Sequence, residues 1–157
     1  MELFFLIKWI HVLSSTILFG FGAGTAWYFW NAHLTRDPAM IAGVGRMVVV
    51  ADWIFTGSSG IVQPASGLWL VHIAGYSLTE SWLMLSYALY ILAFLCWAPV
   101  VRLQIKAQKL AQAARESGEP LGAEYKRTML WWFGLGWPAF LGLLGVFYLM
   151  IAKPVLW

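Results

Sequence analysis

The sequence predicts an all-α integral membrane protein built as a four-helix bundle. Of its 157 residues, 61% are hydrophobic and 11% are charged, whereas soluble domains have about 45–50% apolar and about 25% charged residues. Runs of about 20 apolar residues are long enough to cross a bilayer. Four such spans are found, at about 3–30, 46–73, 81–101 and 128–152. Because no linker or repeat divides the chain, we expect a single transmembrane domain over residues 1–157.

The basic residues predict how the bundle is oriented. Two of the ten, Lys8 and Lys153, lie on one side of the predicted membrane. The other eight lie in or beside the first and third connections: Arg36, Arg46, Arg102, Lys106, Lys109, Arg115, Lys126 and Arg127. The positive-inside rule then places both termini on the periplasmic side of a bacterial inner membrane and the 102–127 loop in the cytoplasm. The pI of 9.2 thus reflects this topology and allows contact with anionic lipid headgroups, and it does not indicate nucleic-acid binding.

The first span carries an ionisable residue, His11, inside an apolar helix. A histidine facing hydrocarbon loses hydrogen-bond partners at a cost of several kcal/mol, roughly, so we expect His11 to face the bundle interior. The predicted inward face combines it with residues at helical spacing: Lys8, Ser15, Gly22 and Ala26. Three roles suit such a histidine, namely structural hydrogen bonding, ligation of haem or another metal, and proton relay. His33 follows the span and is expected in a solvated loop.

The second span is the most polar, and its polar residues share one helical face. They are Asp52, Thr56, Ser59, Gln63 and Ser66, separated by steps of three or four. A polar stripe of this kind must face the bundle, where its groups find partners. Asp52 is open to two interpretations, pairing with a basic group such as Arg46 or a role with a proton or substrate. Pro64 predicts a kink, because it removes the hydrogen bond to the Gly60 carbonyl.

Two further residues lie at about the depth of His11 and are candidate second ligands to a metal. His72 ends the second span, although a straight helix turns it away from the polar stripe. Met84 lies in the outer third of the third span, where a thioether fills space or ligates haem iron. Cys96 is alone, which excludes an intrachain disulfide and a thiolate cluster.

The third helix is expected to continue past Pro99 into the cytoplasm as an amphipathic extension. Its apolar strip consists of Leu103, Ala107, Leu110 and Ala114, opposite Arg102, Lys106 and Lys109. The segment ESGEPLG ends it. The extension could lie on the inner leaflet, receive a partner or serve only to set topology. The fourth span, with small residues along one face, is interpreted as a packing helix.

Three segments, KWIHVLSS, DWIFTGSSGIVQPASGLWL and WPAFLGLLGVFYLMIAKP, carry a family resemblance. The whole chain resembles an uncharacterised family of small bacterial four-helix inner-membrane proteins, known as a domain of unknown function. More distantly, Lys8, His11 and His33 make the first span similar to the bacterial membrane-bound protoporphyrinogen oxidases. That resemblance implies haem b and a porphyrinogen or quinone as substrate. Met84 and Ser86 stand where those enzymes have His and Lys.

These patterns lead to three functional hypotheses. In the first, the chain is a b-type haem protein of the inner membrane that transfers electrons or oxidises a quinone- or porphyrinogen-like substrate, with a redox partner subunit or as a homo-oligomer. His11 is then one axial ligand, Met84 or His72 the other, and Lys8 a partner for a haem propionate. Asp52 and Gln63 transfer protons or bind a quinone headgroup. The alternatives are a cofactor-free scaffold or small transporter subunit, and a copper-handling protein that uses His11 and Met84.

Overall fold

Long helices account for nearly the whole chain. The computed structural model covers residues 1–157 and contains no strand. In chain order the elements are α1 (Glu2–Thr35), α2 (Pro38–Ala51), a π-helical segment η1 (Asp52–Gly57), α3 (Ser58–Ala74), α4 (Ser81–Ser117) and α5 (Ala123–Ala152). Because α2, η1 and α3 follow one another without interruption, four continuous helices are long and apolar enough to cross a membrane. This confirms the all-α class and the four predicted spans.

The helices extend beyond the predicted apolar spans. The second begins at Pro38 rather than at 46, and the Asp37 carboxylate caps it by accepting a hydrogen bond from the Ala39 amide at 2.9 Å. Aspartate at the N-cap followed by proline at the first position is a favourable helix start. The first helix also extends beyond its predicted span, since α1 continues to Thr35. His33, expected in a loop, therefore lies in the last turn of α1, and that expectation was wrong.

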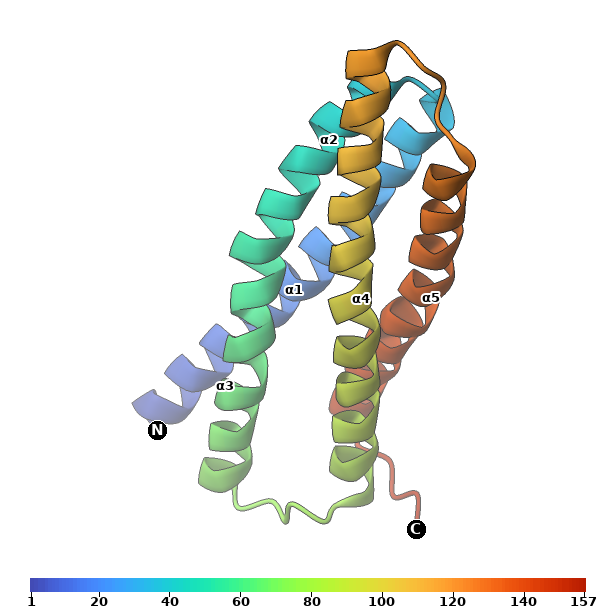
Figure 1. The fold of residues 1–157 in the computed structure, drawn as a ribbon. Coiled ribbons are helices and arrows are strands. Elements are labelled where there is room, and N and C mark those ends of the chain that lie inside the picture. Colours follow the sequence, from blue (N-terminus) through green and yellow to red (C-terminus); the bar gives the residue numbers. More distant parts are fainter.

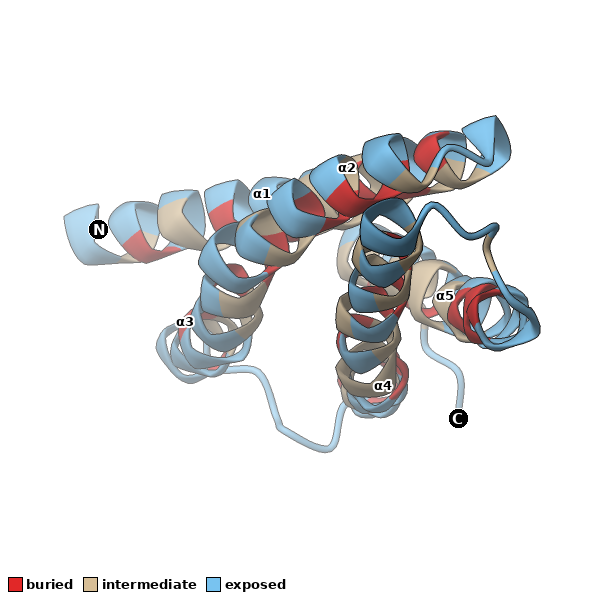
Figure 2. Ribbon diagram, turned by 45° about the horizontal axis from the view of Figure 1, so that its top comes forward, coloured by how far each residue is buried: buried red, intermediate tan, exposed pale blue.

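The helices pair in two units, which Figures 1 and 2 show from two directions. Helix α1 lies along α2, η1 and α3, while α4 lies along α5, and α2 joins the two units through α4. The turns at residues 36–37 and 118–122 lie together at one end of the molecule (Figure 1). Since most of the basic residues surround these turns, we call this the basic end. Both termini and the turn at residues 75–80 lie at the opposite end.

The main apolar core lies toward the basic end. It is formed from α1, α2, α4 and α5, and includes the fully buried Phe29, Ile41, Ala107 and Ala111. The extension of α4 thus packs inside the bundle instead of lying on a membrane surface. A smaller core of Val71, Trp82, Leu83 and Leu149 lies at the opposite end. Figure 2 shows the buried positions on the sides of the helices that face one another.

The inward face of α1 differs by one position from the predicted one. Its buried residues include Ser14, Leu18 and Thr25, with His11 partly buried in line with them. Lys8 is exposed, and the Ser15 hydroxyl donates to the Val12 carbonyl of its own helix. The predicted face was wrong in these members because an apolar helix with small residues all round gives little amphipathic signal.

Helix α3 contains Pro64, which leaves the Gly60 carbonyl without its usual amide partner. The Tyr90 hydroxyl of α4 donates to that carbonyl at 2.6 Å. In hydrocarbon no water can take this role, so a neighbouring helix has to satisfy the freed group. The Tyr90–Gly60 hydrogen bond therefore also links the two helix pairs.

We expect Tyr90→Phe to lower the free energy of unfolding by about 1–3 kcal/mol, because a buried acceptor loses its donor. In a Pro64→Ala background, the residue-64 amide can donate to the Gly60 carbonyl, and the same substitution should cost less than half as much. Unfolding in detergent micelles measures both steps of this double-mutant cycle. Tyr28→Phe, at an exposed tyrosine, is the matched control. Equal costs in both backgrounds would contradict the interpretation.

Candidate functional site

The polar stripe of the second span faces the bundle, as predicted. Asp52, Thr56, Ser59 and Ser66 are buried and Gln63 is partly buried, while the residues between them are mostly exposed. The stripe runs from η1 along α3 and is directed at α1, the helix that packs against both elements. Asp52 and Gln63 are eleven residues apart, or about 16 Å at helical rise. The stripe therefore reaches from the middle of the bundle toward the end opposite the basic end.

Asp52 is held by side chains from three elements. Its Oδ1 accepts hydrogen bonds from the hydroxyls of Thr25 on α1 at 2.9 Å and of Thr56 on η1 at 3.1 Å. Its Oδ2 accepts from the Gln104 amide nitrogen on α4 at 3.0 Å. We call these four residues the Asp52 centre. Only 3% of Asp52 is exposed, so the carboxyl group depends on these neutral partners.

No basic side chain accompanies Asp52. Arg46 is exposed, and the only oppositely charged side chains within 4.0 Å of each other are Lys106 and Glu124, at 2.7 Å. The interpretation that Asp52 pairs with Arg46 was therefore wrong, because Arg46 lies on the outer side of α2. Buried charges in proteins are normally paired with an opposite charge or bound to a metal, and no cationic side chain pairs with this carboxyl group.

Sequence reasoning missed two members of this centre, Thr25 and Gln104. Gln104 belongs to a buried face of α4 that also contains Val101, Ala107 and Ala111. The spacing of these residues could have placed Gln104 inward if the extension had been taken as part of the bundle. Thr25 carries no comparable signal, because a threonine hydroxyl in a helix can instead donate to its own backbone, and here the Phe21 carbonyl lies 2.8 Å from it.

His11 lies at the other end of the stripe and uses both ring nitrogens. Its Nδ1 is 2.9 Å from the Ser66 hydroxyl oxygen, and its Nε2 is 3.3 Å from the Gln63 amide nitrogen. The Ser14 hydroxyl donates to the Gln63 amide oxygen. We call these four residues the His11 cluster. The ring also packs on Gly67, where a Cβ atom would lie 3.1 Å from His11 Cε1, so the absence of a side chain there makes room for the imidazole.

The hydrogen bonds around His11 determine its tautomer. The Ser66 hydroxyl donates to the Val62 carbonyl at 2.7 Å, and it has only one proton. We infer that His11 Nδ1 carries a proton and donates it to Ser66, which leaves Nε2 to accept from Gln63. The Gln63 amide fits this assignment, since its nitrogen donates to His11 while its oxygen accepts from Ser14. The two ring nitrogens, the Ser66 hydroxyl and the Gln63 amide then have mutually consistent roles.

The other residues predicted as ligands do not join His11. Lys8 is exposed, with its amine 5.9 Å from the centre of the Phe4 ring. His72 is exposed near the end of α3. Met84 is 47% exposed on α4, a helix whose principal neighbours are α5 and α2. The structure thus brings neither the His11–Met84 pair nor the His11–His72 pair together.

The chain also offers no cluster of His, Cys, Asp and Glu side chains for a metal ion. No group of three or more such residues is close enough to hold one. A copper site built on His11 and Met84 would need these two residues to be neighbours, and the structure places them on different helix pairs. The residues that do converge in the membrane are neutral hydrogen-bonding groups around one carboxyl group and one imidazole.

Comparison with protein families gives one match. A family described as predicted integral membrane protein (DUF2269) matches residues 5–154. No curated protein and no solved structure matches the chain. The more distant resemblance to protoporphyrinogen oxidases therefore receives no support from these comparisons.

The assigned tautomer gives a direct prediction for spectroscopy. In nitrogen-15 NMR of the labelled protein, we expect His11 to show the shifts of a neutral ring protonated at Nδ1. Ser66→Ala removes the acceptor of that proton and should reduce the Nδ1–H population. Ser15→Ala is the control, because its hydroxyl bonds only its own helix. A wild-type ring protonated at Nε2 would show that the assignment is wrong.

Proposed function

The chain belongs to the family of predicted integral membrane proteins DUF2269, and we propose that it is a small transport protein or transporter subunit that passes protons through the membrane. The proposed path is the polar stripe between the Asp52 centre and the His11 cluster. Ionisable groups inside a membrane are costly and are typical of proton relays and ion pathways. The proposal therefore rests on the two titratable side chains that face this stripe.

The observation that carries the proposal is the isolation of the Asp52 carboxyl group. A purely structural carboxylate in a membrane would be expected to have a cationic partner. Asp52 instead has three neutral partners from three elements. It also begins η1, and π-helical segments inside α-helices occur frequently at functional sites.

The partners of Asp52 can serve the carboxyl group with or without a proton. Around the carboxylate, Thr25, Thr56 and the Gln104 amide nitrogen donate. When Asp52 is protonated, Thr25 can give its own proton to the Phe21 carbonyl at 2.8 Å and accept from Asp52. If the Gln104 amide rotates, its oxygen can likewise accept a hydrogen bond from protonated Asp52, since this buried oxygen has no other partner. Two protonation states are thus accommodated without moving a helix.

The His11 cluster supplies the second titratable group on this path. Its chain of Ser66, imidazole, Gln63 and Ser14 is hydrogen-bonded from end to end. An imidazole can take a proton on one nitrogen and release another from the opposite one. Buried Ser59 lies between Thr56 and Gln63 on the same helical face. The proposed path therefore has polar groups at each turn of the second helix.

The basic end gives the proposed orientation. Eight of the ten basic residues surround it, so the positive-inside rule supports its placement on the cytoplasmic side of a bacterial inner membrane. Both termini would then be periplasmic. The His11 cluster would lie toward the periplasm, and the Asp52 centre nearer the middle of the bilayer.

Proton flux into liposomes tests the proposal. The purified protein is reconstituted with a pH-sensitive dye inside the vesicles, and a potassium diffusion potential drives protons inward. We expect wild-type flux above that of empty liposomes, and we expect Asp52→Asn to return it to that level because the side chain can no longer ionise. Glu119→Gln, at an exposed carboxylate, should leave the flux unchanged. Wild-type flux equal to that of empty liposomes, or unaltered flux in Asp52→Asn, would overturn the proposal.

Haem binding through His11 is the second candidate, and one observation favours it. The Nε2 atom has only the long 3.3 Å contact with Gln63, so this nitrogen is the one that could ligate iron. A single proximal histidine suffices in globins and peroxidases, and bound haem would supply one-electron chemistry. This candidate predicts a Soret band in protein expressed with ample haem, lost in His11→Ala and retained in His72→Ala. Colourless protein from the same expression would rule it out.

A further inference from the structure

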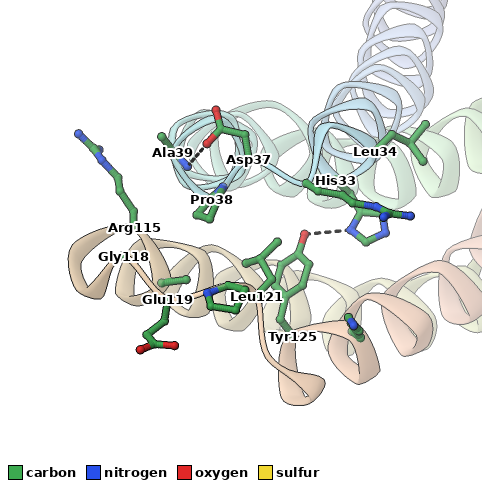
Figure 3. Close-up of a pocket in the computed structure, with 14 residues that line it drawn as sticks. His33, Leu34, Asp37, Pro38, Ala39, Arg115, Gly118, Glu119, Leu121 and Tyr125 are labelled. Carbon is green, nitrogen blue, oxygen red and sulfur yellow. Dashed lines mark hydrogen bonds between the residues drawn. The ribbon is translucent and has the colours of Figure 1, made fainter.

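A cavity of about 930 Å³, lined by both charged and apolar residues, opens at the basic end, away from the polar stripe. It lies where the turn after α1 meets the ends of α4 and α5, and Figure 3 shows its lining. At its base, His33 Nδ1 and the Tyr125 hydroxyl are hydrogen-bonded at 3.0 Å. This bond joins the last turn of α1 to the first turn of α5, so the base of the cavity is fixed by two helices.

Three cations line this cavity, Arg36, Arg115 and Lys126, and none of them forms an ion pair. Two acidic residues, Asp37 and Glu119, also contribute to the lining, which leaves one positive charge in excess. The Asp37 carboxylate also caps α2 through the Ala39 amide, and in Figure 3 the side chains of Glu119 and Arg115 both point away from the His33–Tyr125 pair. The cavity therefore offers a surplus of positive charge to an anion.

The rim of the cavity lies at the level where the bundle would leave the hydrocarbon. Leu34 lines it and is 57% exposed. On α1, the exposed aromatic residues Trp27 and Tyr28 lie within two turns of it. Exposed Trp and Tyr of this kind mark the membrane–water interface. A group bound in the cavity would thus sit at the height of the lipid headgroups.

We propose that this cavity binds the phosphate headgroup of an anionic phospholipid. Arginine binds phosphate with two parallel N–H donors, and lysine binds it as a point charge. Basic pockets between helices at a membrane surface suit such headgroups. A free phosphate ion would satisfy the same cations, but it would leave the apolar side chains of Leu34 and Leu121 without an acyl chain to cover them. A lipid satisfies both parts of the lining.

Native mass spectrometry of the full chain, released from detergent with added phosphatidylglycerol or phosphatidylcholine, tests this proposal. We expect selective retention of phosphatidylglycerol. In the triple variant Arg36→Gln, Arg115→Gln, Lys126→Gln, the affinity for phosphatidylglycerol should fall about tenfold or more. The reason is that each basic residue near anionic lipid raises the binding constant by a factor of about five. All three residues are exposed, so the variant should fold, and circular dichroism checks this.

The matched control removes three other exposed charges that lie on the same side of the apolar spans but outside the cavity: Arg102→Gln, Lys109→Gln and Arg127→Gln. It should keep at least half of the wild-type affinity. Equal losses in both variants would mean that only the overall charge attracts the lipid and would overturn the proposal. Retention of affinity in the cavity variant would do the same. An excess of inorganic phosphate should not displace the lipid, and complete displacement would assign the cavity to free phosphate instead.

Discussion

The hydrogen bonds to the Asp52 carboxyl group are the interaction on which the middle of the bundle depends. In a bilayer no water can satisfy a buried carboxyl group, so its partners must come from the protein. Here they come from α1, η1 and α4. Since α1 and α4 belong to different helix pairs, the same contacts that satisfy Asp52 also fix how the two pairs meet.

The two ends of the molecule are held together by different forces. Near the basic end, the side chains of Phe29, Ile41, Ala107 and Trp132 form a continuous apolar core. Toward the opposite end, α1 and α3 meet through the polar His11 cluster, and a separate small core joins residues of α3, α4 and α5. The proposed proton path thus lies where polar groups, rather than close apolar packing, connect the helices.

Helix α1 connects the His11 cluster, the Asp52 centre and the cavity at the basic end. Its inward face carries His11 and Ser14 near one end, Thr25 in the middle and His33 in the last turn. These residues bond three different elements: His11 and Ser14 bond α3, Thr25 bonds η1, and His33 bonds α5. A shift of α1 along its axis would therefore disturb the stripe and the lipid cavity together, which physically links the two proposals.

Sequence reasoning predicted the coarse architecture well, because hydropathy and helical spacing depend on residue order alone. Four spans follow from the length of apolar runs, and the inward direction of Asp52, Thr56, Ser59, Gln63 and Ser66 follows from their steps of three and four. The same reasoning predicted that His11 faces the interior. These features are local, since each can be recognised within one helix.

Only the tertiary structure decided which helices supply the partners. Thr25 and Gln104 lie far from Asp52 in the sequence, and Tyr90 lies thirty residues from the Gly60 carbonyl that it satisfies. Met84 and His72 were expected near His11 because all three share a predicted depth in the membrane. Depth, however, does not determine in which direction a side chain points or which helix lies beside it. The sequence thus determined a membrane bundle with an inward polar stripe. The rotation and pairing of the helices are set by packing between distant segments. They decided that the Asp52 carboxyl group in this stripe has neutral hydrogen-bond partners and no cationic one.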